Sequence, residues 1–334
     1  MRRGWPTLLA LVPAALLLSA CGSKANSLAP HSPQEKSIAS LFWWMTGACF
    51  VGLGVITALL VLAWARRNRM GPGREPGERA GWLVVIVFGI GVMVAGVTVL
   101  FFFSDVHLIG ITEEPAAAET ELTVDAIGHQ WYWEFRYPGT PNAVTADEMH
   151  IPVRTPVRVN ADTADVVHEV WVPQLNRKID TIPGQSNAIE LYADQVGRYR
   201  GVCNQYCGLQ HAHMDFWVYV DPPATFRAWL RRQAADAAQP SGAQARAGKR
   251  VFLAGSCSSC HTIRGTPADG TVGPDLTHLA SRTSLAGLVL PNHRADLAAW
   301  ITDAQHFKPG NQMPDIDVPP AQLRRLVAYL EGLK

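Results

Sequence analysis

Two uncharged apolar runs place the strongest constraint on how this 334-residue chain folds. Residues 41–65 and residues 81–103 are each long enough to cross the hydrocarbon core of a bilayer as an α-helix, so we expect a transmembrane hairpin. The segment between the runs is rich in arginine, and basic residues favour the cytoplasmic side of a membrane. These arginines are Arg66, Arg67, Arg69, Arg74 and Arg79. We therefore expect the chain after Asp105 to lie on the outer face of the membrane.

The N-terminus has the pattern of an exported bacterial protein. Arg2 and Arg3 precede an apolar stretch at residues 8–18, and small residues follow that stretch. The tetrapeptide that ends at Cys21 resembles a bacterial lipobox, in which the cysteine becomes the lipidated first residue of the mature protein. We expect residues 1–20 to be a lipoprotein-type signal peptide and the chain to reside in the bacterial plasma membrane. An ordinary signal peptide with a chance cysteine is the alternative.

Charge and cysteine content exclude two classes of protein. The formal net charge is only +1, so no basic field indicates binding to nucleic acid. Six cysteines are too few and too clustered for the disulfide framework of a small secreted domain. They are Cys21, Cys49, Cys203, Cys207, Cys257 and Cys260. The last four form two close pairs, which are typical of ligand or attachment sites.

The composition changes after the apolar runs. Short β-branched and aromatic runs separated by Pro and Gly indicate an all-β sandwich or barrel over about residues 121–221. The predicted strands are 122–127, 148–153, 156–159, 166–172, 188–192 and 216–220.

The remainder of the chain has a helical pattern. A stretch rich in Ala, Gln and Arg leads to a last segment with apolar residues at helical spacing at 297–301 and 323–333. The expected organisation is a signal peptide (1–20), an N-terminal segment with the membrane hairpin (21–110), a β domain (116–225), a linker (226–247) and an all-α domain (248–334).

The densest chemistry lies in residues 203–214, which hold two thiols, two imidazoles and a thioether. Thiolate, imidazole and thioether ligands together favour copper over magnesium or calcium, and His168 in the preceding strands is a natural further imidazole. Two cysteines provide enough bridging sulfur for two metal ions. A structural zinc site made by Cys203, Cys207, His211 and His168 is the alternative. His213 is one step from the ligand spacing, and we expect it not to be a ligand.

At this point the sequence resembles cytochrome c oxidase subunit II, whose binuclear copper site has the pattern Cys-x3-Cys-x3-His-x2-Met with an upstream His. The resemblance implies a cupredoxin-like β domain and a set of six ligands. These are bridging thiolates from Cys203 and Cys207, terminal imidazoles from His168 and His211, a weak axial thioether from Met214 and the backbone carbonyl of Gln205. Many relatives have Glu where this chain has Gln205, and that Glu side chain helps to hold a magnesium ion, so this chain departs from the family pattern at a magnesium-ligand position.

A second segment carries the same resemblance. Residues 128–135 are similar to the aromatic segment of that family, in which a tryptophan beside the copper site receives electrons. By position this tryptophan is Trp131, with Tyr132 beside it. Large aromatic residues at alternate strand positions more often serve packing, and that is the alternative. With residues 147–153 and 180–184, the resemblance covers most of residues 40–222.

The last domain contains the attachment motif of a c-type haem, Cys257-Ser258-Ser259-Cys260-His261. Met313, on a Pro-Gly-rich loop, resembles the methionine ligand of class I cytochromes c, and Pro274 resembles the proline whose carbonyl orients the proximal imidazole. A redox-active dithiol is the alternative for the two cysteines. For Met313 the alternatives are a core methionine, with His278, His293 or His306 as the distal ligand.

Together these features predict the electron-accepting subunit of a proton-translocating, caa-type bacterial cytochrome c oxidase with a fused cytochrome c domain. The cofactors that the resemblance implies are one covalent haem c and two copper ions. The partners are subunit I, where oxygen is reduced, subunit III, and a cytochrome or quinol–cytochrome reductase as electron donor. The alternative class is a membrane-anchored copper chaperone or thiol oxidoreductase with a cytochrome domain. Such a protein requires neither Met214 nor electron transfer between a haem and a copper centre. Nitrous oxide reductase lacks the hairpin, and quinol oxidase subunits lack the copper ligands.

Overall fold

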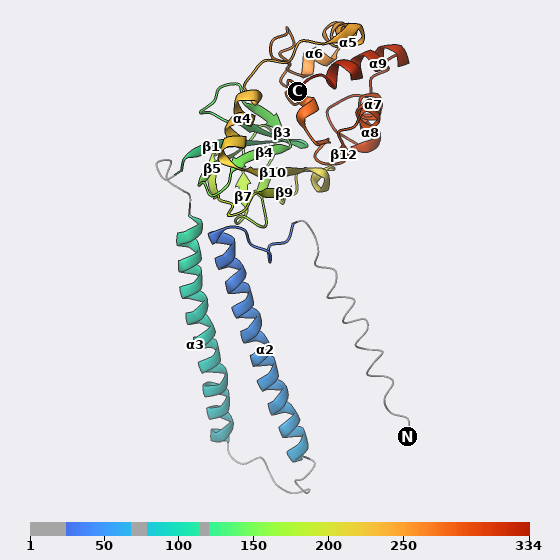
Figure 1. The fold of residues 1–334 in the computed structure, drawn as a ribbon. Coiled ribbons are helices and arrows are strands. Elements are labelled where there is room, and N and C mark those ends of the chain that lie inside the picture. The colour runs from blue at the N-terminus through green and yellow to red at the C-terminus, as the bar shows by residue number, and fades with distance from the viewer. Residues whose placement is uncertain (1–24, 68–78, 114–119) are drawn as a thin grey trace, which may run out of the picture. The chain divides into compact units, whose positions relative to one another are not determined.

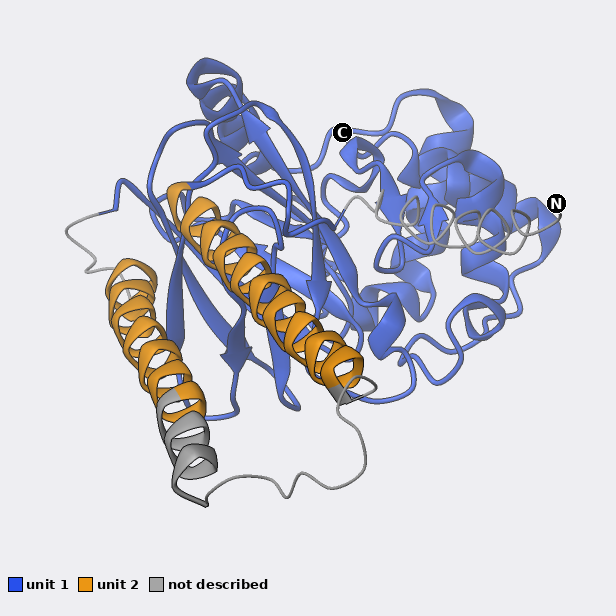
Figure 2. Cartoon of the chain, turned by 90° about the horizontal axis from the view of Figure 1, so that it is seen from below, with its two compact units in different colours: residues 1–32, 114–334 blue, residues 33–113 orange. Residues whose placement is uncertain are grey.

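The computed structural model describes residues 25–67, 79–113 and 120–334, which fall into two compact units. One unit contains the hairpin, residues 33–113, and the other contains residues 1–32 and 114–334 (Figure 2). The expected signal peptide, with Cys21, and the arginines at 69 and 74 lie outside the described residues.

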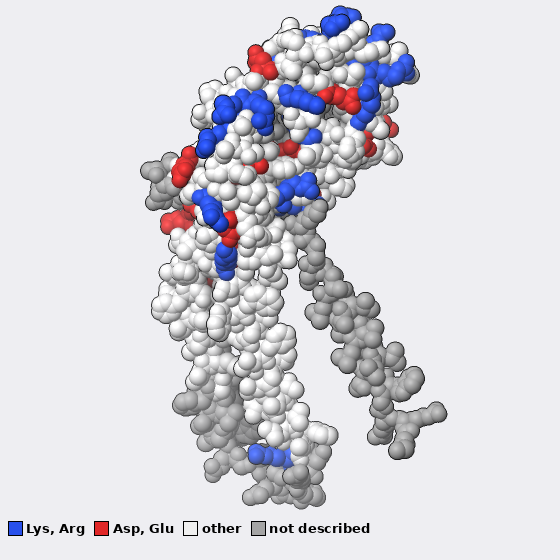
Figure 3. Space-filling view, viewed as in Figure 1, with Lys and Arg blue, Asp and Glu red and all other residues white. Residues whose placement is uncertain are grey.

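The hairpin unit consists of two long helices, α2 (Pro33–Arg67) and α3 (Arg79–Thr112). Each contains a span long and apolar enough to cross a membrane, and the most apolar windows of both are entirely unburied. Figure 3 shows that the described surface along most of both helices carries no charged side chain. Both helices run beyond the expected bounds of 41–65 and 81–103, because an apolar run marks the lipid-facing part, whereas backbone hydrogen bonding continues into flanking polar residues.

The β domain is a sandwich of two five-stranded sheets (Figure 1). The strand order is β3-β2-β1-β5-β8 in one sheet and β4-β10-β9-β6-β7 in the other, with parallel pairs β1–β5 and β4–β10 among antiparallel ones. The expected cupredoxin-like class is confirmed. The strands are β1 (Leu122–His129), β2 (Tyr132–Arg136), β3 (Val144–Ala146), β4 (Glu148–Pro152), β5 (Val157–Thr163), β6 (His168–Trp171), β7 (Ile179–Thr181), β8 (Asn187–Leu191), β9 (Gly197–Cys203) and β10 (Asp215–Asp221).

Alternation of buried and partly buried residues explains how the strands pack. In β1 and β5, Val124 faces Val159 across the ladder and both are fully buried. Aromatic rings fill the space between the sheets, where Phe216 of β10 packs against Trp133 and Phe135 of β2 at centroid distances of 5.7 and 5.3 Å. Such a core fixes the strand ends from which the site residues project.

The C-terminal domain is built from short helices, as expected from its apolar spacing. Helix α5 packs along α9, and Phe252 of α5 meets the ring of Tyr329 of α9 at 6.1 Å. A two-residue ladder, β11 (Ser284–Leu285) with β12 (Leu290–Pro291), and an isolated bridge between Thr262 and Asp269 depart from an all-α pattern in this domain as described. The helices are α5 (Gly242–Ala254), α6 (Cys257–Cys260), α7 (Arg294–Thr302), α8 (Ala304–Phe307) and α9 (Pro320–Leu330).

The segment expected as a linker, residues 226–247, is helical at both ends. Helix α4 (Pro223–Gln233) packs on the β domain, and Trp229 stacks on His150 at 4.1 Å. Residues 234–241 then connect α4 to α5, and Ala237 is already buried in the core of the C-terminal domain. The connection is therefore short and held at both ends.

Candidate copper and haem sites

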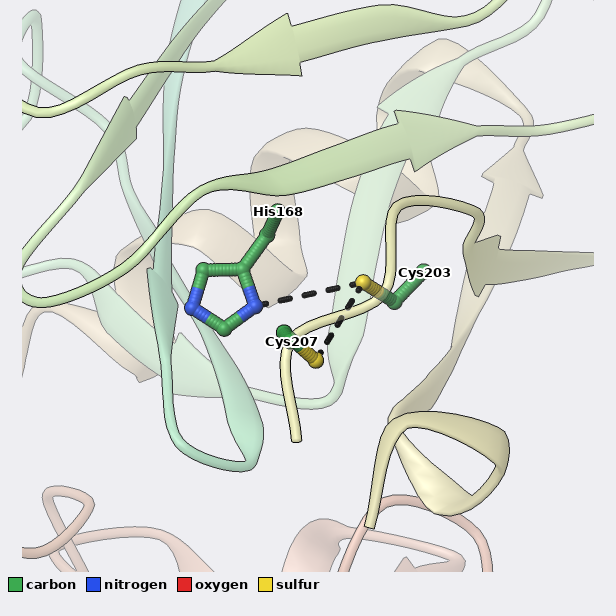
Figure 4. Close-up of side chains that lie close together, drawn as sticks. All are labelled: His168, Cys203 and Cys207. Carbon is green, nitrogen blue, oxygen red and sulfur yellow. Dashed lines mark hydrogen bonds between the residues drawn. The ribbon is translucent and has the colours of Figure 1, made fainter. Parts of the chain in front are cut away.

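The expected copper ligands come from strand β6 and from the continuous segment that runs from the end of β9 to the start of β10. Figure 4 shows His168, at the start of β6, pointing toward Cys203, at the end of β9, with Cys207 of the following loop beside it. The Cys203 Sγ atom lies 3.9 Å from His168 Nδ1 and 3.8 Å from Cys207 Sγ. The donor atoms of these three buried residues all lie within 4.8 Å of one another.

The remaining expected ligands surround the two sulfur atoms. The backbone oxygen of Gln205 lies 3.4 Å from Cys203 Sγ. On the other sulfur, Cys207 Sγ lies 3.6 Å from His211 Nδ1 and 3.9 Å from Met214 Sδ. His213, which was not expected to be a ligand, has its Nδ1 atom 2.8 Å from Gln210 Oε1.

The chemistry of this donor set fits a metal centre. Donors that share one ion at bond lengths of about 2.3 Å are separated by roughly 3.7 Å in a tetrahedral arrangement, which is close to the separations found. The pKa of Cys203 falls to about 4 because Cys207 and His168 hydrogen-bond its thiolate, whereas that thiolate raises the pKa of the Cys207 thiol. Two thiolates this close require a cation to remain ionised together.

His168 is oriented by contacts that the sequence did not reveal. Its Nε2 atom lies 2.8 Å from Asp165 Oδ1, which leaves Nδ1 facing the sulfur, and Asp165 Oδ2 accepts the backbone N–H of Gln130 at 2.6 Å. A Cβ atom at Gly128 would lie 2.6 Å from the His168 ring, so the ring needs a glycine there. The three-residue spacing of Asp165 and His168 is the only sequence signal for this pair.

The aromatic segment connects the copper ligands to a second site. The Trp131 Nε1–H group donates to the carbonyl of Cys207 at 3.0 Å, and Gln130 Nε2 donates to the same oxygen at 2.7 Å. Trp131 and Tyr132 also line a cavity between the β domain and the C-terminal domain. The same tryptophan therefore contacts a copper-site residue and this cavity.

The cavity collects the residues expected to hold haem. Cys257, Cys260, His261 and Met313 all line it, and it contains about 1420 Å³ of free space, part of it open to solvent. The alternative distal ligands are elsewhere among the described residues, because His278, His293 and His306 do not line the cavity. His278 has its Nε2 atom on the carbonyl of Ala235 at 3.0 Å.

The arrangement around His261 fits a metal ligand. Its Nδ1 atom lies 2.8 Å from the carbonyl of Pro274, the hydrogen bond that the resemblance implies, so Nε2 keeps its lone pair. Burial lowers the pKa of His261, which favours the neutral imidazole. A Cβ atom at Gly273 would collide with the same ring. The Met313 loop is fixed by Gln305, whose Nε2 group donates to the carbonyl of Met313 at 2.8 Å.

A buried lysine joins the two domains. Lys308, only 2% exposed, donates from Nζ to the carbonyls of Trp131, His213 and Ala286 at 2.6, 2.8 and 2.9 Å. Burial lowers its pKa to about 8. Further interdomain hydrogen bonds run from Gly287 N to Asp147 Oδ2, from Thr283 N to Glu148 Oε1, and from Gln210 Nε2 to the carbonyl of Pro309.

Comparisons with known proteins identify the family. The family model described as cytochrome C oxidase subunit II, periplasmic domain, matches residues 139–220, and the one described as cytochrome c matches residues 245–334. Cytochrome c oxidase subunit 2 of Alkalihalophilus pseudofirmus is 31% identical over 332 residues, which cover 96% of this chain and 94% of that protein. The chain belongs to the cytochrome c oxidase subunit II family.

A second relative matches over a similar length, and a solved structure matches over the β domain alone. Cytochrome c oxidase subunit 2 of Bacillus subtilis is 28% identical over 98% of this chain and 96% of its own. A crystal structure of the periplasmic domain of subunit II from Bradyrhizobium japonicum is 31% identical, with a TM-score of 0.32, and covers 35% of this chain and 94% of that chain. The two family-model matches show that this subunit II combines a copper-type β domain with a cytochrome c domain that implies haem c, as the sequence predicted.

The contact between Asp165 and His168 makes a testable prediction about metal affinity. Asp165→Ala removes the acceptor that orients the imidazole, and such partners typically contribute about 10–100-fold to metal affinity. We expect copper binding to the full chain in detergent to weaken by this factor in a competition titration with a copper chelator. Asp162→Ala, at the end of β5, is the matched control, and equal affinities for the two variants would contradict the role of Asp165.

The Lys308 contacts predict how the domains stay docked. Lys308→Met leaves three carbonyls without a donor, and each lost hydrogen bond costs about 1 kcal/mol. We expect faster amide hydrogen exchange at Thr283 and Gly287, whose N–H groups donate across the interface, and unchanged exchange in β1 and β5. Lys249→Met on α5 is the control. Slow exchange at both amides in Lys308→Met would show that the lysine does not hold the interface.

Proposed function

We propose that this subunit receives electrons at a c-type haem in its C-terminal domain and passes them through Trp131 to a binuclear copper centre in its β domain. The observation that carries the proposal is the position of Trp131, whose indole donates to the carbonyl of Cys207 and whose side chain lines the haem cavity. Tyr132 lines the cavity next to it. A single residue then lies between the two proposed redox sites.

Two copper ions, rather than one metal, account best for the distribution of the donors. Each sulfur has its own imidazole and its own weaker donor: His168 and the Gln205 carbonyl beside Cys203, and His211 and Met214 beside Cys207. Among the described residues, the donor atoms of His168, Cys203 and Cys207 lie close enough together to share one ion, and His211 is not part of that group. A tetrahedral zinc site needs all four strong donors around one ion. Thiolate and thioether donors also favour copper.

In the C-terminal domain, Cys257 and Cys260 would attach the haem, and His261 and Met313 would bind its iron. A haem with His and Met ligands supplies one-electron transfer at a raised potential. The protein contributes the Pro274 carbonyl, which orients His261, and the Gln305 side chain, which fixes the Met313 loop.

Membership of the family indicates where this electron transfer takes place and which partners take part. We propose that α2 and α3 anchor the chain in the bacterial plasma membrane, with both redox domains on the outer face. The electron acceptor is the haem-copper site of subunit I, where oxygen becomes water and protons are pumped, and subunit III completes the core. A cytochrome or quinol–cytochrome reductase delivers the electrons.

The direct test of this function is metal analysis with absorption and electron paramagnetic resonance on the haem-loaded, copper-reconstituted full chain. We expect two coppers and one covalent haem per chain, with a seven-line hyperfine pattern from an electron shared by both coppers. One zinc, or one copper with an ordinary four-line pattern, would contradict the binuclear centre.

The position of Trp131 predicts a kinetic effect. Trp131→Leu removes both the indole and its hydrogen bond to Cys207, so we expect slower electron transfer from haem to copper in flash photolysis. The copper resonance spectrum should stay unchanged, because no ligand is altered. Trp217→Phe on β10, outside the cavity, is the control. Equal rates for wild type and Trp131→Leu would exclude this route.

Met313 is tested by the haem potential. Met313→Ala should leave the haem covalently attached at Cys257 and Cys260 but lower its reduction potential, because the thioether ligand stabilises the reduced iron. His278→Gln, which changes a rival ligand, should leave the potential unchanged. The reverse result, with a shift only in the His278 variant, would remove Met313 from the ligand set.

A further inference from the structure

The haem cavity is closed on one side by the β domain. His129, Trp131, Tyr132 and Asp147 line that side, and the residues of the C-terminal domain line the rest. The lining is mostly apolar, as a porphyrin ring requires. A buried polar side chain in this lining that has no partner in the protein therefore indicates a polar group on the ligand.

Among the described residues, four buried polar atoms at this cavity have no hydrogen-bond partner in the protein. They are His129 Nε2, the Tyr132 hydroxyl, Arg282 Nε and Ser284 Oγ, and all four residues line the cavity. The last three are hydrogen-bond donors, whereas the role of the His129 nitrogen depends on its tautomer. A buried donor is costly to leave unpaired, so three such donors at one cavity indicate a bound acceptor. The donors come from both domains.

The charge on Arg282 points to an anionic acceptor. Its Nη2 group donates to the carbonyl of Asp275, and burial lowers its pKa, so its charge is poorly solvated. The nearby carboxylates already accept other hydrogen bonds: Asp147 from the N–H groups of Trp133 and Gly287, and Glu148 from Thr283. The free Nε–H therefore suits a carboxylate of the ligand.

A c-type haem carries two propionate carboxylates on an otherwise apolar ring. We propose that a haem propionate is bound by the Tyr132 hydroxyl of the β domain together with Arg282 and Ser284 of the C-terminal domain. The β domain is then part of the haem-binding site as well as the electron acceptor. This inference rests on the proposed function, because it requires haem attached at Cys257 and Cys260.

The neighbours of Tyr132 support this role. Its ring stacks face to face on His129, with centroids 4.5 Å apart and an interplanar angle of 5°. His129 Nε2 lies 3.9 Å from Glu134 Oε2, which is beyond hydrogen-bonding distance. Burial raises the pKa of Tyr132, so the hydroxyl keeps its proton and remains a donor. The stack fixes the ring, and the hydroxyl is left for the ligand.

The donors affect the haem potential because they offset the negative charge of the propionate. Without them, that charge stabilises the oxidised, more positive haem. Loss of a donor should therefore shift the reduction equilibrium toward oxidised haem while the thioether bonds remain intact.

The test is a potentiometric titration of the haem-loaded full chain carrying Tyr132→Phe. We expect the reduction equilibrium to shift about fivefold toward oxidised haem, which is about 40 mV at 59 mV per tenfold change. Ser284→Ala should shift it in the same direction, and Arg282→Gln should shift it further. Tyr329→Phe is the matched control, because the Tyr329 hydroxyl is also buried and unpaired, but that residue does not line the cavity. It should leave the potential unchanged.

A spectroscopic readout separates propionate binding from a general loss of packing. In the reduced-minus-oxidised infrared difference spectrum of haem labelled with ¹³C at the propionate carboxyls, Tyr132→Phe should move the carboxylate band and Tyr329→Phe should not. An unchanged band and potential in Tyr132→Phe, with haem attached, would overturn the inference and leave the proposed function standing. Absence of covalent haem from the wild-type chain would instead overturn the proposed function.

Discussion

One turn, residues 129–132, connects the functional parts of this subunit. The backbone N–H of Gln130 is held by Asp165, which also orients His168. The Trp131 indole donates to the carbonyl of Cys207, and its backbone carbonyl accepts from Lys308. The copper ligands, the haem cavity and the domain interface therefore depend on the position of this single turn, and a displacement of the turn would change all three together.

Burial of Lys308 explains how the C-terminal domain keeps its place. Burying an ammonium group is costly unless each of its donors finds an acceptor, and here three carbonyls from three separate segments provide them. The three carbonyls surround the Lys308 ammonium group only when the domains are docked in this one orientation. Fusion of the domains raises their effective concentration, and the lysine adds the orientation that a tether alone does not provide.

The sequence alone was enough to predict the two ligand sets, because their spacing carries the chemistry directly. The pair Cys203 and Cys207 and the motif at Cys257 imply ligand positions whatever the packing, and the structure brings the expected side chains together. The six predicted strands are present, but β2, β3, β7 and β9 are not among them. Of these, β3 and β7 have three residues each, too few for a hydrophobic period to be recognised, and β9 contains two glycines and two arginines. The roles of Lys308, Asp165 and Gln130 could not be predicted, since each depends on a partner brought close only by tertiary folding.

The central claim is that electrons pass from haem to copper within one chain. The most direct measurement is flash-induced one-electron reduction of the haem in the copper-loaded full chain, followed by the decay of the reduced haem and the bleaching of the copper band. The account predicts first-order transfer with a rate constant that is independent of protein concentration. A rate proportional to protein concentration would mean that the docked arrangement around Trp131 does not carry the electron, and would contradict the account.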